Sequence, residues 1–93
     1  MDWEASAEIA SCKNRPGFEK DGEHALLILR QHKIQAQLTY VQEQQGIKAI
    51  TENAKQSTNW VILVNGKDAS AARKVLDAAV KKGLPIILNE AQK

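Results

Sequence analysis

Trp60-Val61-Ile62-Leu63-Val64 is an unbroken apolar run, and the interpretation of the whole chain depends on it. Such a run, rich in β-branched residues, is typical of a strand that is buried on both faces. Asp68 is a good N-cap residue, and apolar residues recur behind it at helical spacing up to Val80. A second apolar run, Leu84-Pro85-Ile86-Ile87-Leu88, follows directly. We therefore predict a β-α-β unit, whose two strands are parallel and whose connection is right-handed.

The first half of the chain predicts three more elements. A weak strand is expected over about Ala5 to Cys12, and helical periodicity runs from Glu19 to Lys33. From Ile34 to Val41 apolar and polar residues alternate, which indicates a strand with one wetter face, and we place it at the sheet edge.

The segment after Gly46 is the least certain part of the pattern. Ile47, Ile50 and Ala54 recur at i, i+3 and i+7, which predicts a short helix. The element order is then β-α-β-α-β-α-β, and this alternation predicts an α/β fold with a parallel sheet and helices on both faces, a half lobe of flavodoxin or Rossmann type. If residues 46–56 form a loop instead, the alternative is a ferredoxin-like βαββαβ fold of the α+β class.

One test separates these two folds. In the parallel sheet we predict that the strand Trp60 to Val64 is central and almost wholly buried, because it has no polar face. An antiparallel pairing with the strand Ile34 to Val41 would favour the ferredoxin-like fold.

Length and composition set broad limits on function. The 93 residues are predicted to form a single domain, 1–93, with 13 basic and 11 acidic side chains and a net charge of +2. No basic run is longer than Lys81-Lys82, so the charge pattern does not favour nucleic acid. Cys12 is the only cysteine, which excludes an intrachain disulfide and predicts a buried thiol.

The first residues of the chain do not have the pattern of a signal peptide. Met1 to Glu4 lacks a basic segment followed by an apolar one, and no apolar run is long enough to span a membrane. We expect a cytoplasmic protein that does not bind membranes, with a mature secreted fragment as the alternative.

The chain carries no catalytic signature that we recognise. It has no glycine-rich phosphate loop, no metal-ligand spacing and no nucleophile elbow. We predict a non-enzymatic protein with no catalytic residue, no metal and no cofactor. His24 and His32 lie eight residues apart in the predicted helix, too far to bind one metal from a single turn, so we expect both to be ordinary helix residues.

Polar residues follow the predicted strands. Asn14, Asn65 and Asn89 each come just after a strand, and in a parallel sheet the carboxyl ends of the strands meet at one edge. Their amides offer donors and acceptors that suit a polar small molecule.

These same segments resemble a known family. The pattern of a strand ending in Asn65, Asp68 before an Ala-rich helix, and Gly83-Leu-Pro-Ile-Ile-Leu-Asn89 is similar to the first half of a type I periplasmic sugar-binding protein and of LacI-type effector domains. The resemblance implies that Phe18 stacks on a sugar ring while Asn14, Asn65 and Asn89 bind its hydroxyls. It also implies weak binding, because the chain has no second lobe to close over the sugar.

Two other functions stay open at this point. The chain is expected to act as a protein–protein interaction module if it forms a homodimer through the strand Ile34 to Val41 or the helix Ala69 to Val80. It also resembles the ribosomal kink-turn-binding family at Gly46-Ile47-Lys48, Val61 to Val64 and Gly83 to Ile87, which implies RNA binding.

Overall fold

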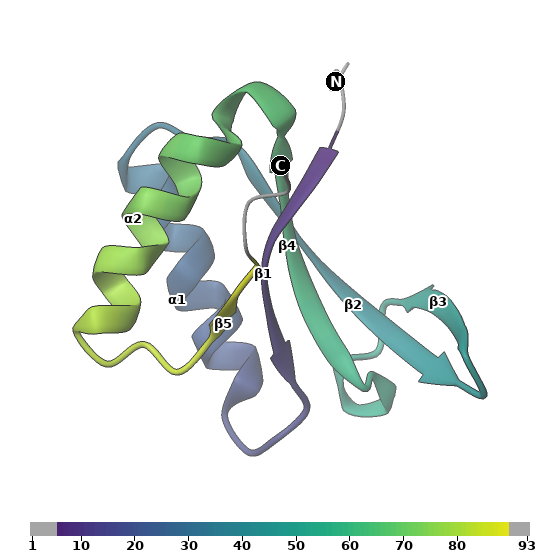
Figure 1. The fold of residues 1–93 in the computed structure, drawn as a ribbon. Helices are drawn as coiled ribbons and strands as arrows, with labels where there is room; N and C mark the ends of the chain where they lie inside the picture. The colour runs from purple at the N-terminus through teal and green to yellow at the C-terminus, as the bar shows by residue number, and fades with distance from the viewer. Residues whose placement is uncertain (1–5, 90–93) are drawn as a thin grey trace.

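The computed structural model describes residues 6–89, which form one antiparallel sheet with two helices packed on one of its faces (Figure 1). The strand order is β3-β2-β4-β1-β5. In chain order the elements are β1 (Ser6–Lys13), α1 (Phe18–Gln31), β2 (Ala36–Gln44), β3 (Ile47–Thr51), β4 (Asn59–Asn65), α2 (Ala69–Lys81) and β5 (Ile87–Leu88). Short 3-10 turns, Ala54–Gln56 and Gly66–Asp68, lie before and after β4.

The parallel sheet predicted from the sequence is wrong. Every hydrogen-bonded pair of strands is antiparallel, including β2 with β4. Two strand-helix-strand units do exist, but in each unit the two strands are not neighbours in the sheet, because a third strand lies between them. β1 lies between β4 and β5, and β4 lies between β1 and β2. Without β3, the strand order is that of the ferredoxin-like βαββαβ alternative, which is compatible with the structure.

The helices also depart from the prediction of a sheet covered on both faces. Figure 1 shows α1 and α2 side by side on the same side of the sheet. They pack against β1, β2 and β4, and α2 also contacts β5. The opposite sheet face therefore carries no helix within residues 6–89.

The central position of the Trp60 to Val64 strand is confirmed, because β4 is the middle strand of five. Trp60, Ile62 and Val64 are fully buried beneath the helices. Val61 points to the other face and is still only 8% exposed. Its cross-strand neighbours Ser11 and Thr39 flank it on both sides, so burial on two faces does not require a parallel sheet.

The helix predicted from Ile47, Ile50 and Ala54 is replaced by a β-hairpin. β2 and β3 are joined by the two-residue loop Gln45-Gly46, in which both residues have positive φ angles, 52° and 80°. This is the type I′ geometry that matches the twist of paired strands. As a result, β2 is not the edge strand that its alternation predicted; β3 is.

The remaining boundaries follow the sequence closely. α1 and α2 lie within two residues of their predicted ranges, and β1 matches the weak first strand, apart from Ala5, which lies outside the described residues. The second run of the β-α-β unit forms only the two-residue strand β5. Asp68 precedes α2 but makes no side-chain cap; Asn65 Oδ1 instead accepts a hydrogen bond from the Lys67 backbone N–H at 3.2 Å.

Candidate interaction surface

The four residues predicted to bind a ligand are divided between the two ends of the sheet. β1 and β4 run in opposite directions, with Ser6 opposite Asn65 and Lys13 opposite Asn59. Asn14 therefore lies at one end of the sheet and Asn65 at the other. Asn89 donates its backbone N–H to Ile9 O and so lies towards the Asn65 end, with β1 between the two. Phe18 starts α1 near Asn14.

Each of these four residues also has a structural partner. Asn14 Nδ2 donates to Ser57 O at 2.8 Å, and Asn89 Nδ2 donates to Glu8 Oε1 at 2.9 Å. Phe18 is buried, and its carbonyl oxygen accepts a 2.6 Å hydrogen bond from the indole N–H of Trp60. The antiparallel sheet thus brings together no sugar site from Asn14, Phe18, Asn65 and Asn89.

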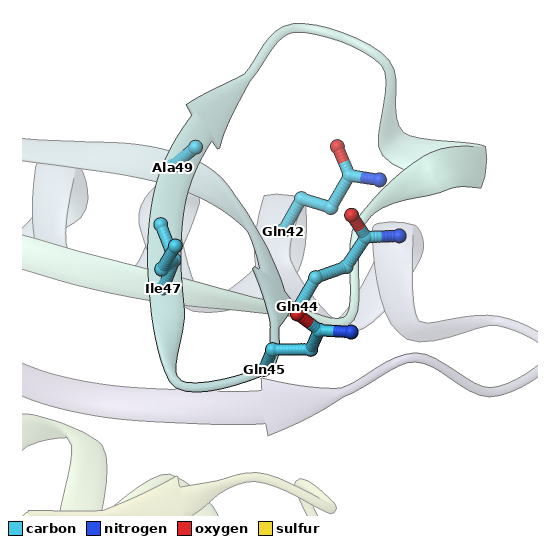
Figure 2. Close-up of a pocket in the computed structure, with 5 residues that line it drawn as sticks. All are labelled: Gln42, Gln44, Gln45, Ile47 and Ala49. Carbon is cyan, nitrogen blue, oxygen red and sulfur yellow. The ribbon is translucent and has the colours of Figure 1, made fainter.

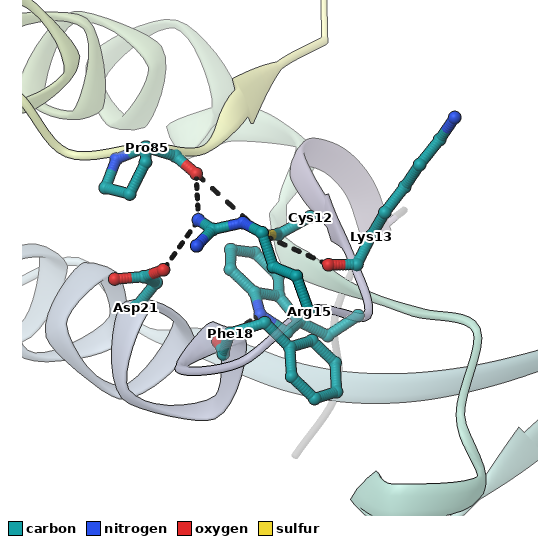
Figure 3. Close-up of polar contacts among 7 residues, drawn as sticks. Cys12, Lys13, Arg15, Phe18, Asp21 and Pro85 are labelled. Carbon is teal, nitrogen blue, oxygen red and sulfur yellow. Dashed lines mark hydrogen bonds and ion pairs between the residues drawn. The ribbon is translucent and has the colours of Figure 1, made fainter.

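A polar clamp joins the start of α1 to the segment after α2 (Figure 3). The Arg15 guanidinium is 2.7 Å from Asp21 Oδ2 and donates a second 2.7 Å hydrogen bond to Pro85 O. The buried Cys12 thiol lies beneath it, with Sγ 3.5 Å from Lys13 O and 3.9 Å from Pro85 O. The burial predicted for Cys12 is confirmed, and these groups stabilise the fold.

A hollow of about 350 Å³ adjoins this clamp, between α1 and the end of α2. Its walls include Asp21, His24 and Lys82 around an apolar floor. Asp21 already forms an ion pair with Arg15, so one charged group at the rim of this hollow has a structural partner.

The most unusual surface is the free edge of β3. Ile47 is 71% exposed and Ile50 is 78% exposed, and no strand within residues 6–89 pairs with the outer side of β3. The outer side of an edge strand presents unpaired backbone N–H and C=O groups. We define the β3 edge as residues Ile47–Glu52, which combine these backbone groups with two exposed isoleucines.

The two faces of the hairpin differ in character. On the face without helices, Ile50 is opposite Val41 and Lys48 is opposite Glu43. The other face holds an open hollow of about 440 Å³ (Figure 2). Figure 2 shows carboxamide side chains from β2 and the turn together with apolar residues of β3; the residues are Gln42, Gln44, Gln45, Ile47 and Ala49.

Tyr40 marks the boundary between the covered core and the hairpin. Its ring packs edge-on against Phe18, with centroids 5.9 Å apart. Partial burial raises the pKa of the Tyr40 phenol above its ordinary value of 10.0, and the carboxylates of Glu19 and Glu23 raise it further. The hydroxyl therefore stays neutral at physiological pH.

Sequence reasoning missed the β3 edge because Ile47, Ile50 and Ala54 fit a helical period. The signal that could have revealed it is Gln45-Gly46, since a glycine at the second position of a two-residue loop is typical of a type I′ hairpin.

Comparison with known proteins gives no relative: no family model, no curated protein and no solved structure matches the chain. The resemblances to sugar-binding and kink-turn-binding proteins therefore have no support from these comparisons. Neither helix of the described region, residues 6–89, has the length and apolar character needed to cross a membrane.

Proposed function

We propose that this protein is a non-enzymatic protein–protein interaction module that binds an extended segment of its partner along the β3 edge. In this mode the partner adds a strand to the sheet, and main-chain hydrogen bonds supply much of the affinity. We also propose that it works in the cytoplasm, since its single cysteine is a free, buried thiol that needs no oxidising compartment.

The observation that carries this proposal is the exposure of Ile50 and Ile47 on an edge strand. Proteins protect free edges with charged residues, prolines, bulges or very short strands. β5, at the other edge, has only two residues, whereas β3 has five and presents two isoleucines with a single charged residue, Lys48, between them. An edge of this length with apolar side chains favours pairing with another strand.

Two observations support a protein partner over the alternatives. Sheets that read RNA stack bases on exposed aromatic rings. In the described part of the chain Trp60 and Phe18 are buried and Tyr40 packs on the helix-covered side, so the open face offers no such ring. A sugar is not favoured either, because Asn14 and Asn65 lie at opposite ends of the sheet.

Site-specific photocrosslinking in producing cells tests the proposal. A photoreactive residue at position 50 should form adducts with a partner segment, and mass spectrometry should map them to one short sequence. Leu27 on α1 is 54% exposed and serves as the matched control position. Lys48→Pro removes a backbone N–H from the outer side of β3, because the amides of Ile47 and Ala49 face β2 across the two-residue turn, and it should abolish the adducts. Equal labelling from positions 27 and 50, or no adduct from position 50, would count against the β3 edge.

A further inference from the structure

We infer that the partner on the β3 edge is a second copy of this chain, paired antiparallel about a two-fold axis at Ile50. This inference rests on the proposed function, because it names the occupant of the same edge. It follows from how the charged residues are spaced along β3.

Lys48 and Ile50 lie on the same face of β3, and Glu52 is the first residue after this strand, at a bend. In the dimer Glu52 extends the strand and lies on that same face. The two charges are therefore equally spaced about Ile50 and have opposite signs. A two-fold axis perpendicular to the sheet at Ile50 pairs this residue with its own copy. The same axis brings Lys48 opposite Glu52 of the second copy, and Glu52 opposite Lys48 of the second copy.

The neighbouring registers lack this complementarity. A two-fold axis at Lys48 places two ammonium groups face to face, and an axis at Glu52 places two carboxylates face to face. An axis at Ala49 or Thr51 leaves both charges without a charged partner across the edge. Directly opposite charges stabilise paired strands and like charges destabilise them. The sequence of the β3 edge is thus self-complementary in one register.

The symmetry of the pairing closes the assembly. An isologous contact uses the same strand of both copies, so two chains satisfy each other and no filament forms. The sheet then continues through both copies, with both helical layers on the same side. Within one chain Lys48 already lies opposite Glu43, so in the dimer it would have a carboxylate on each side.

A contact between two five-residue strands is small, so we expect a weak and concentration-dependent dimer. Interfaces below roughly 1,000 Å² belong to transient complexes. Sedimentation analysis from about 10 μM to about 1 mM protein detects a dimer whose dissociation constant lies between these two concentrations.

Charge reversal provides the test. Lys48→Glu alone places carboxylates opposite each other in the dimer, and Glu52→Lys alone places ammonium groups opposite each other. Each variant by itself should dimerise about tenfold more weakly than the original chain. An equimolar mixture of the two variants should form a heterodimer at near-original strength, because every opposed pair is then of opposite sign. The double variant K48E/E52K should self-associate again.

The mixture also controls for damage within one chain. Lys48→Glu places a carboxylate opposite Glu43 and weakens its own hairpin, and mixing would not repair that defect. Recovery in the mixture supports the Ile50 register. If neither charge reversal weakens the dimer, or if mixing the two single variants does not restore dimerisation, the Ile50 register is wrong. Either result leaves the β3 edge as the interface. A chain that stays monomeric up to about 1 mM overturns the second copy as partner. Crosslinking from position 50 then decides separately whether the edge binds another protein.

Discussion

β4 and β3 both contain isoleucine, but only β4 has its apolar side chains covered. In β4, Ile62 is fully buried between β1, β2 and the helices. In β3, Ile50 has a neighbour on one side only and is 78% exposed. The same residue type therefore stabilises the fold in one strand and remains available for association in the other.

The largest expected effect separates the two isoleucines by their cost to stability. Ile62→Ala should lower the free energy of unfolding by about 2–5 kcal/mol, because it leaves a cavity in a closely packed core. Ile50→Ala should lower it by less than about 0.5 kcal/mol, measured at a dilution where the chain is monomeric. Chemical denaturation monitored through the tryptophans measures both changes. Similar costs for the two variants would show that β3 is part of the core.

A smaller effect is expected at the turn that creates the edge. Gly46→Ala should cost about 1 kcal/mol of unfolding free energy, because its φ of +80° is unfavourable for a residue with a Cβ. No atom lies within 4 Å of the added methyl group, so crowding does not contribute. Gly46→Asn is the matched control, since asparagine tolerates this conformation better. It should recover part of the loss, and equal costs for both variants would argue against the type I′ turn.

The smallest effect concerns Tyr40, between the core and the hairpin. Its pKa is raised by burial and by Glu19 and Glu23, so folding favours the protonated phenol. That contribution to stability is complete below the ordinary pKa of 10.0 and is lost as the pH rises from there through the folded-state pKa. The chain has one tyrosine, so its ultraviolet titration is unambiguous.

Tyr40→Phe is the control for this alkaline loss, because the lysines also titrate in that range. The variant should lose stability less steeply than the original chain above pH 10. Equal slopes, or a phenol that titrates at or below its ordinary pKa, would show that Tyr40 is not shielded by the core.

The sequence contains enough information to locate most of the helices and strands, but not the order in which the strands pair in the sheet. Periodicity identified α1, β2 and α2, and an unbroken apolar run identified β4, because the apolar residues of all four elements face one common core. It could not show that β1 lies between β4 and β5, because a strand-helix-strand pattern is the same whether the two strands are neighbours or are separated by a third. The alternation in β2 was a usable sign, since one wet face is typical of antiparallel sheets.

The candidate site was not predictable from the residues selected for it. Asn14, Asn65 and Asn89 were grouped only because parallel strands would bring their ends together, and antiparallel pairing separates Asn14 from Asn65. The β3 edge was hidden because Ile47 and Ile50 are three residues apart, a spacing shared by a helical face and by the two faces of a short strand.

Backbone amide exchange across a range of protein concentrations tests the central claim most directly. If a second copy occupies the β3 edge, the outward-pointing amides of Ile47–Glu52 should exchange more slowly as the concentration rises from about 10 μM to about 1 mM. Amides of β4 should keep the same rates, because they are already paired on both sides within one chain. Exchange rates in β3 that do not change with concentration would contradict the account.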